Sequence, residues 1–210
     1  MQDAPAGQQP GRIADSAIVA DMSDPLSPPV VTSSGTKELP AYVSNGLIGL
    51  RVVDIPIRAG ISILNGYAGL HPTLLIEANA RTPYPVAGDI CIDGLWLTLA
   101  PQQAEFIDQR YDFSNGELTT RFRFMANGVT VVAEVLTFCS RKQPTLVLQE
   151  MTVRADRPCD LTLRAKVDPD GIQGEMLEKR LETPGRDDAE TDGSMLWSSF
   201  GGKSAAASPS

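Results

Sequence analysis

Apolar residues recur at every second position over most of the chain between Leu39 and Val167, and glycine, asparagine, aspartate and proline interrupt this alternation. A period of two places neighbouring side chains on opposite faces of a strand, so the pattern predicts many short antiparallel strands. No segment carries a convincing helical period. We therefore expect an all-β protein.

The stretch "DICIDGLWLTL" contains the clearest predicted hairpin. Asp93-Gly94 supplies two residues that readily adopt the positive φ angles of a tight primed turn. The strand after the turn is expected to place three leucines on one face: Leu95, Leu97 and Leu99.

Two Asn-Gly pairs predict a meander of long strands in the following segment. Asn115-Gly116 and Asn127-Gly128 divide "QRYDFSNGELTTRFRFMANGVTVVAEVLTF" into three strands. The resulting strands of about eight to twelve residues are typical of a β-sandwich. After the break at Pro144, "TLVLQEMTVRA" and "DLTLRAKV" predict two further strands.

The two ends of the chain differ from its middle in composition. Residues 1–37 are rich in Pro, Gly, Ser, Ala and Asp and contain no aromatic residue, so we expect a disordered leader. The domain is expected to span residues 38–200, with an acidic loop over 168–192 and a last strand in "SMLWSSF". Residues 201–210 are expected to form a disordered tail.

Length and charge limit the classes of function. A chain of 210 residues suits one domain with irregular ends. The net charge of -8, without a clustered basic surface, argues against a nucleic acid or an anionic membrane as partner. No apolar run of about 18 residues is present that would span a bilayer.

The cysteines and the N-terminus allow predictions about the cellular compartment and about cofactors. Cys91, Cys139 and Cys159 are too few and too widely spaced for a zinc motif, so no metal and no cofactor are expected. Their odd number favours a reduced compartment. The N-terminus lacks the features of a signal peptide, which predicts a cytoplasmic protein unless a signal sequence lies upstream of Met1.

The stretch "YVSNGLIGLR" raises the question of a phosphate-binding loop. It lacks the Gly-Lys-Ser/Thr ending of a Walker motif and the three glycines of a dinucleotide fingerprint. The residues after Gly49 favour a strand rather than a helix. We expect Asn45-Gly46 to form a turn and Gly49 to allow a close approach.

Few residues stand out as candidates for catalysis. His71 is the single histidine, and its setting beside Pro72 favours a structural or solvent-facing ring over a catalytic triad. Glycoside hydrolysis needs two carboxylates across a sugar, but the chain has too many candidates for composition to select a pair. The carboxylates on or beside predicted strands are Glu77, Asp89, Asp93, Asp108, Asp112 and Glu134.

Aromatic rings are the other candidates, because a flat ring can stack on a pyranose. Tyr84, Trp96, Tyr111 and Trp197 are available, and packing in the core is the more common use of such rings. We name Tyr84 and Trp96 as the predicted carbohydrate-binding residues.

Several stretches taken in order resemble the N-terminal domain of glycoside hydrolase family 65. They are "LPAYVSNGLIGLR", "ILNGYAGLHP", "IDGLWLTL", "QRYDFSNGELTTRFRF" and "VTVVAEVLTFCSRKQPTLVLQEMTVRA", and together they cover about residues 38 to 200. The family includes phosphorylases of maltose, trehalose and kojibiose, and acid trehalase. Thr137 stands where the family more often has arginine.

The resemblance implies an antiparallel β-supersandwich like that of galactose mutarotase, incomplete at its C-terminus and placed ahead of an (α/α)6 barrel in the family. The family's catalytic glutamate lies on that barrel, so the resemblance assigns no catalytic residue to this chain. The chain alone is expected to be inactive, as a fragment, a split subunit or a remnant of an α-glucoside enzyme.

The resemblance also suggests partners. The barrel, in cis or in trans, an α-glucoside and a second copy of the chain are the candidates. The alternative from another class is a free-standing carbohydrate-binding module.

Overall fold

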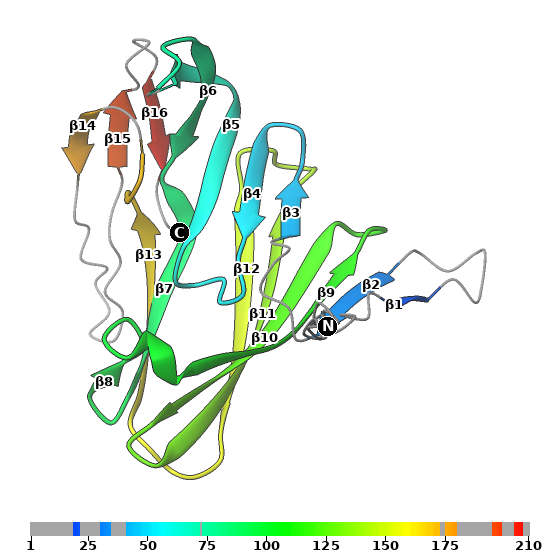
Figure 1. Ribbon diagram of the computed structural model, residues 1–210, viewed down its shortest axis with the longest axis vertical. Helices are drawn as coiled ribbons and strands as arrows, with labels where there is room; N and C mark the ends of the chain where they lie inside the picture. The colour runs from blue at the N-terminus through cyan, green and yellow to red at the C-terminus, as the bar shows by residue number, and fades with distance from the viewer. Residues whose placement is uncertain are drawn as a thin grey trace, which may run out of the picture.

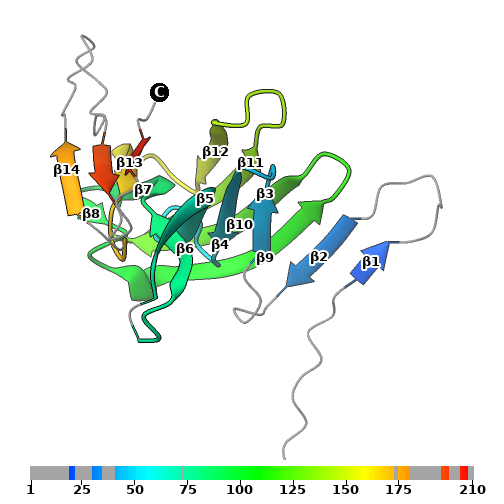
Figure 2. The ribbon, with the colours of Figure 1, turned by 90° about the horizontal axis from the view of Figure 1, so that it is seen from above.

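The computed structural model describes residues 19–21, 30–34, 41–71, 73–172, 175–179, 195–198 and 204–207. Within these ranges the chain consists of strands and one short 3-10 helix, η1 (Pro101–Gln103). The strands form four antiparallel sheets, which Figures 1 and 2 show from two directions. The expected all-β antiparallel fold is confirmed.

The first layer is a six-stranded sheet in the order β1-β2-β9-β10-β11-β12. Its last four strands are consecutive in the chain and form the predicted meander. Asn127 and Gly128 both have positive φ angles in the β10–β11 turn, as expected. The strands are β1 (Val19–Asp21), β2 (Val30–Ser34), β9 (Ala104–Asp112), β10 (Glu117–Ala126), β11 (Val129–Cys139) and β12 (Val147–Ala155).

The second layer contains two sheets. One has the order β3-β4-β5-β6 and the other the order β13-β7-β8. The strands are β3 (Ala41–Ser44), β4 (Ile48–Val52), β5 (Gly60–Leu70), β6 (Glu77–Thr82), β7 (Tyr84–Ile92), β8 (Leu95–Trp96) and β13 (Leu161–Asp168).

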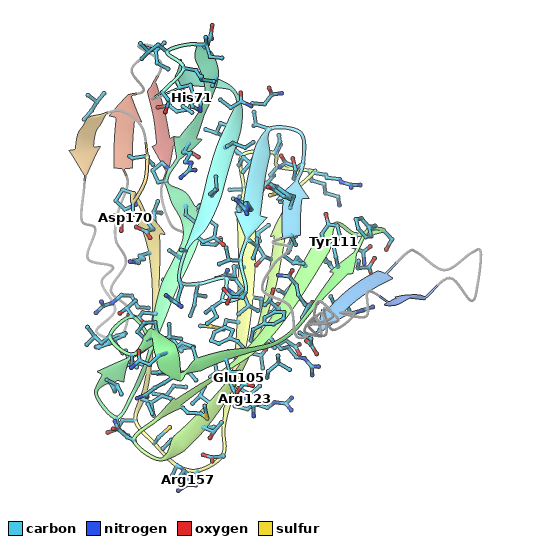
Figure 3. All side chains as sticks on the ribbon, viewed as in Figure 1. His71, Glu105, Tyr111, Arg123, Arg157 and Asp170 are labelled. Carbon is cyan, nitrogen blue, oxygen red and sulfur yellow. The ribbon has the colours of Figure 1, made fainter. Side chains whose placement is uncertain are left out.

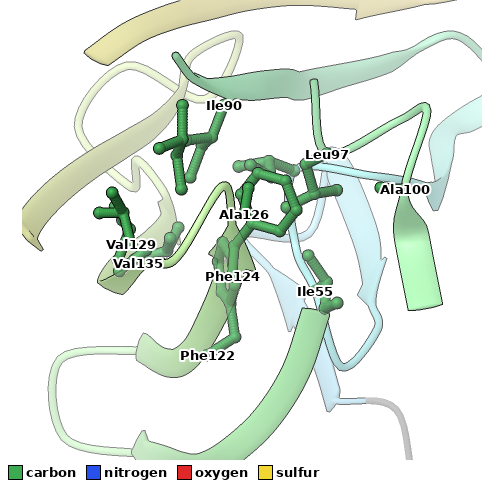
Figure 4. Close-up of a cluster of buried hydrophobic side chains, with 13 residues drawn as sticks. Ile55, Ile90, Leu97, Ala100, Phe122, Phe124, Ala126, Val129 and Val135 are labelled. Atoms are coloured by element: carbon green, nitrogen blue, oxygen red, sulfur yellow. The ribbon is translucent and has the colours of Figure 1, made fainter. Parts of the chain in front are cut away.

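The core lies between the two layers, because alternate residues of each sheet point inward. Along β10, every second residue from Leu118 to Ala126 is buried, and Phe122 and Phe124 are fully enclosed. Figure 4 shows these two rings beside Ile90 of β7 and Leu97, in a cluster that joins both layers. A second cluster joins β3 and β4 to β10 and β11 through the side chains of Val43, Leu50, Val52, Leu118 and Cys139.

Strand β7 is buried on both faces. Its inward residues Ile90 and Ile92 contact the meander, and its outward residues Asp89 and Cys91 are also buried. Gly88 is required here because an added Cβ would lie 2.5 Å from the carbonyl oxygen of Arg164 on β13. Nearly every residue of this central strand is therefore buried, as is typical of a strand that is covered on both faces.

The stretch "YVSNGLIGLR" is a turn between two strands, as expected. The side-chain oxygen of Asn45 accepts hydrogen bonds from the amides of Leu47 and Ile48, at 3.0 and 2.9 Å. Gly46 has a φ of 93°, and an added Cβ at Gly49 would lie 3.1 Å from Ile63. The Asn45 amide group also donates to the carbonyl oxygens of Ser140 and Pro144, so the turn fixes the β11–β12 loop.

The predicted strand face of Leu95, Leu97 and Leu99 is wrong. The Asp93-Gly94 turn forms as expected, with φ angles of 48° and 85°. Strand β8 then ends at Trp96, and the amide of Leu99 bonds to the Trp96 carbonyl in a tight turn. Leu97 is consequently buried, whereas Leu99 is 72% exposed.

Short strands lie within the expected leader, acidic loop and tail where the structure describes them. Strand β2 lies within the expected leader and pairs with β9. The expected last strand is confirmed as β15 (Met195–Ser198). It lies between β14 (Glu175–Lys179), inside the expected acidic loop, and β16 (Ser204–Ala207), inside the expected tail. The rest of the expected leader, loop and tail lies outside the described residues.

Candidate carbohydrate-binding surface

Trp96 lies on the outer face of the three-stranded sheet, half-buried. It pairs with Cys91 across β7 and β8, so both side chains point away from the core. The guanidinium carbon of Arg164, on β13, lies 4.4 Å from the centre of the Trp96 ring. The cation–π contact joins β8 to β13 across β7 and covers one face of the ring.

A buried carboxylate fixes the turn that follows Trp96. Asp89 is 5% exposed, and its Oδ1 accepts hydrogen bonds from the amides of Ile90 and Thr98, at 2.9 and 3.1 Å. Its Oδ2 accepts one from the Thr98 hydroxyl at 2.5 Å. Both oxygens are therefore used to hold the backbone, which gives Asp89 a positioning role beneath Trp96 rather than a free carboxylate.

Tyr84 lies in the core, 3% exposed, at the beginning of β7. Its hydroxyl donates a hydrogen bond to the Pro56 carbonyl oxygen at 2.9 Å, and its ring fills the space beside Gly60. Burial, followed by the charge of Cys139, raises the pKa of Tyr84 above its ordinary value. A ring enclosed in this way offers no face to a sugar, so the predicted surface role of Tyr84 does not fit its position.

The structure does not bring the two predicted residues together. Tyr84 begins β7, whereas Trp96 pairs with Cys91 near the end of the same strand. Sequence reasoning missed Arg164, which is the residue that contacts Trp96. Nothing in the local sequence identifies it, because the contact depends on the register between β13 and β7.

Other carboxylates on or beside strands pair with groups of the domain itself. Asp108 forms an ion pair with Arg121 on the outer face of the meander. Glu105 pairs with Arg123 at 2.9 Å on the same face, and Figure 3 labels both of these residues. Asp93 accepts a hydrogen bond from the Asp160 amide at 2.8 Å, which ties the β7–β8 turn to the start of β13.

The structure shows the surroundings of two other candidate residues, His71 and Tyr111. His71 is structural, because its Nδ1 accepts hydrogen bonds from the amides of Thr73 and Leu74, at 3.2 and 3.1 Å. Tyr111 meets Phe113 edge to face, with ring centres 4.2 Å apart. The ring of Trp197 lies outside the described side chains.

The cysteines are free thiols, with Cys91 and Cys139 buried and Cys159 half-buried. Within the described ranges, no three His, Cys, Asp or Glu side chains gather to hold a metal ion. The same part of the chain contains no helix with the length and apolarity that a bilayer crossing needs.

The fold and the surface define the chain as an antiparallel β-sandwich domain. Residues 81–198 match the family model "Glycosyl hydrolase family 65, N-terminal domain", which spans both layers from β6 to β15. The chain therefore belongs to glycosyl hydrolase family 65, as the ordered sequence resemblance predicts.

Comparison with solved structures supports the fold. A protein assigned as a kojibiose phosphorylase from the human microbiome superimposes with a TM-score of 0.60 at 12% sequence identity. The match covers 80% of this chain and 25% of that chain, so the described protein spans about a quarter of the larger one. A search of curated proteins found no match.

Proposed function

We propose that this chain is the non-catalytic N-terminal sandwich of a family 65 enzyme that acts on α-glucosides. In this role the domain supports an (α/α)6 catalytic barrel, supplied in cis or in trans, and shapes one side of the active-site entrance. The observation that carries the proposal is the family match over residues 81–198, which includes β7 to β13 and therefore strands of both layers.

The contacts of the conspicuous polar residues agree with a supporting role. Asp89 and Asn45 direct their side chains to backbone groups of the domain itself. The ion pairs of Arg121 and Arg123 lie on a solvated sheet face. Such groups stabilise a scaffold, and chemistry on a sugar would need carboxylates free to face the glycosidic bond.

The test is an activity assay on the purified chain. With kojibiose, maltose or trehalose, in the presence and absence of inorganic phosphate, we expect neither glucose nor glucose 1-phosphate above a blank. A heat-sensitive release of either product by the isolated chain would overturn the proposal. Co-expression with a family 65 catalytic barrel tests the supporting role directly. We expect this chain to increase the yield of soluble, active barrel.

One observation favours carbohydrate binding as a second candidate function. Trp96 lies half-exposed on a sheet face with Arg164 held against its ring, and the ring and the guanidinium together could contact a sugar. Calorimetry with kojibiose, maltose and trehalose tests it. Saturable binding by the isolated chain would support this function if Trp96→Ala removes the binding. Tyr42→Ala, at another exposed ring, should leave it unchanged.

A further inference from the structure

Two leucines of β13 point into the layer between the sheets and yet remain exposed. Leu161 pairs with Ile92 and Leu163 pairs with Ile90 on β7, so each leucine shares a sheet face with its partner. Both isoleucines are completely buried, whereas Leu161 is 38% exposed and Leu163 is 47% exposed.

The exposure follows from the unequal width of the two layers. Strand β12 is the last strand of the meander and packs over β7, where Met151 and Val153 contact the cluster that contains Ile90 and Ile92. Strand β13 lies one strand further out than β7. Among the described residues no strand of the first layer lies opposite β13, so its inner leucines have no cover.

The outer edge of β12 is also unpaired. Within the part of the chain that the structure describes, β12 pairs with β11 alone, over Val147 to Ala155. Its inward side chains are half-buried rather than buried, because their outer side is open. A free edge of this kind displays a row of backbone donors and acceptors and is a template for another strand.

We propose that an extended strand from another part of the enzyme adds to the free edge of β12 and covers Leu161 and Leu163. This inference rests on the proposed function, in which the domain is held beside a larger polypeptide. A strand at that edge would lie opposite β13, because neighbouring strands in each layer are about 4.8 Å apart. It would complete the first layer over the exposed leucines.

The side chains of β12 define the chemistry of the added strand. The outward residues are Leu148, Glu150, Thr152 and Arg154, all exposed. An antiparallel partner complements them with an acidic residue opposite Arg154 and a basic residue opposite Glu150, because opposite charges across a strand pair are stabilising. Its alternate residues are apolar, since they face Met151, Val153 and the leucines of β13.

A second copy of the chain does not fit this edge. Two β12 strands paired about a twofold axis would place the partner's β12 directly over β13 of the first copy. In each copy β7 lies beneath β12. The β7 strand of the second copy would therefore clash with β13 of the first copy, because both would fill the same space. The occupant is therefore a single donated strand without its own second layer at this position.

The experiment uses the whole chain and a synthetic peptide as the probe. The peptide Val-Glu-Val-Thr-Val-Lys-Val places glutamate opposite Arg154 and lysine opposite Glu150 in an antiparallel pairing. A control peptide of the same composition, Val-Val-Val-Glu-Thr-Lys-Val, lacks the alternation. We expect saturable binding of the first peptide, measured by fluorescence anisotropy, and slower hydrogen exchange of β12 amides on its addition.

Substitutions in the protein separate a docked strand from non-specific contact. Leu163→Lys is expected to weaken binding at least about tenfold, whereas Thr162→Lys on the opposite face of β13 leaves it unchanged. Glu150→Lys is expected to weaken binding about two- to fivefold, and a peptide with glutamate in place of its lysine should restore it. Circular dichroism of each variant verifies that the sandwich still folds.

Equal binding of the two peptides, protection confined to amides outside β12 and β13, or no binding at millimolar peptide would overturn the inference. Dimerisation of the chain that Leu163→Lys abolishes would also overturn it, because the occupant would then be a second copy. The measurement uses no sugar, so its failure leaves the proposed function to its own activity assay. Conversely, sugar turnover by the isolated chain would refute the proposed function without altering peptide binding.

Discussion

The Tyr84 hydroxyl donates a hydrogen bond to the carbonyl oxygen of Pro56 at 2.9 Å, and thereby ties the start of β7 to the loop after β4. The phenol is buried together with this acceptor, so the bond satisfies a donor that has no access to water. An aromatic residue that looked available for a ligand in the sequence thus connects two segments of the core.

Replacing Tyr84 with phenylalanine should lower the free energy of unfolding by about 1 to 2 kcal/mol, because the Pro56 carbonyl is left without its donor. Urea denaturation at pH 8 measures the loss. Tyr42→Phe is the matched control, since Tyr42 is 66% exposed. An equal loss in both variants would contradict the role assigned to the buried bond.

The same residue predicts a dependence on alkaline pH. Burial raises the pKa of Tyr84 above the ordinary value of 10.0, so the unfolded chain releases this proton more readily than the folded one. The contribution to stability is complete below pH 10 and declines as the pH rises above it. Stability measured between pH 9 and 11 should therefore fall less steeply in Tyr84→Phe than in the unchanged protein.

Two glycines should differ in their tolerance of alanine. A Cβ at Gly60 would lie 2.2 Å from the Tyr84 ring, which is enclosed in the core and cannot move aside cheaply. We expect Gly60→Ala to cost about 3 kcal/mol or more. At Gly46 a Cβ would meet open space, and the φ of 93° alone should cost about 1 to 2 kcal/mol.

The midpoints of urea unfolding for the two alanine variants give the comparison. Gly60→Ala should be the less stable by a clear margin. A reversed order would show that the Tyr84 ring is less firmly held than its contacts indicate.

Asp89 and Thr98 should behave as one unit. Asp89→Asn replaces the charged acceptor of the Thr98 hydroxyl with an uncharged amide group, and should cost about 2 kcal/mol of stability. Because Thr98→Val removes the same bond from the other side, the double variant should lose less than the sum of the single losses. Strict additivity in the denaturation midpoints would exclude the coupling.

The three thiols should differ in reactivity in the folded protein. Burial raises the pKa of Cys139 to about 11, and its Sγ lies 3.7 Å from the Val43 carbonyl oxygen. Cys159 is half-buried, so iodoacetamide at pH 8 should modify it before Cys139. Mass spectrometry of the digested protein gives the order, and in urea the three thiols should react at similar rates.

Local turn chemistry explains which parts of the fold could be predicted from sequence. Asp93-Gly94 and Asn127-Gly128 select tight turns through their own backbone preferences, so the hairpins on either side follow from short stretches. The meander between β9 and β12 is built from consecutive strands and needs no distant information. The family resemblance also depended on these stretches.

The features that could not be predicted from the sequence depend on contacts between residues that are distant in the chain. Leu99 turns outward because the chain bends after Trp96, where Asp89 binds the Thr98 amide from β7. The depth of Tyr84 depends on its acceptor 28 residues earlier, which alternation along β7 does not reveal. The contact between Trp96 and Arg164 likewise follows from pairing of β7 with β13.

The position of β7 also has a consequence for how the protein is made. Its partner β13 follows only after the whole meander, and Asp93 lies 67 residues before the Asp160 amide that it binds. Contacts so far apart form late, whereas the consecutive hairpins of β9 to β12 close quickly. On the ribosome, Ile90 and Ile92 therefore emerge before the strand that lies beside them. During that interval the nascent chain exposes a strand that is buried on both faces in the folded protein, which is when chaperone binding should matter most.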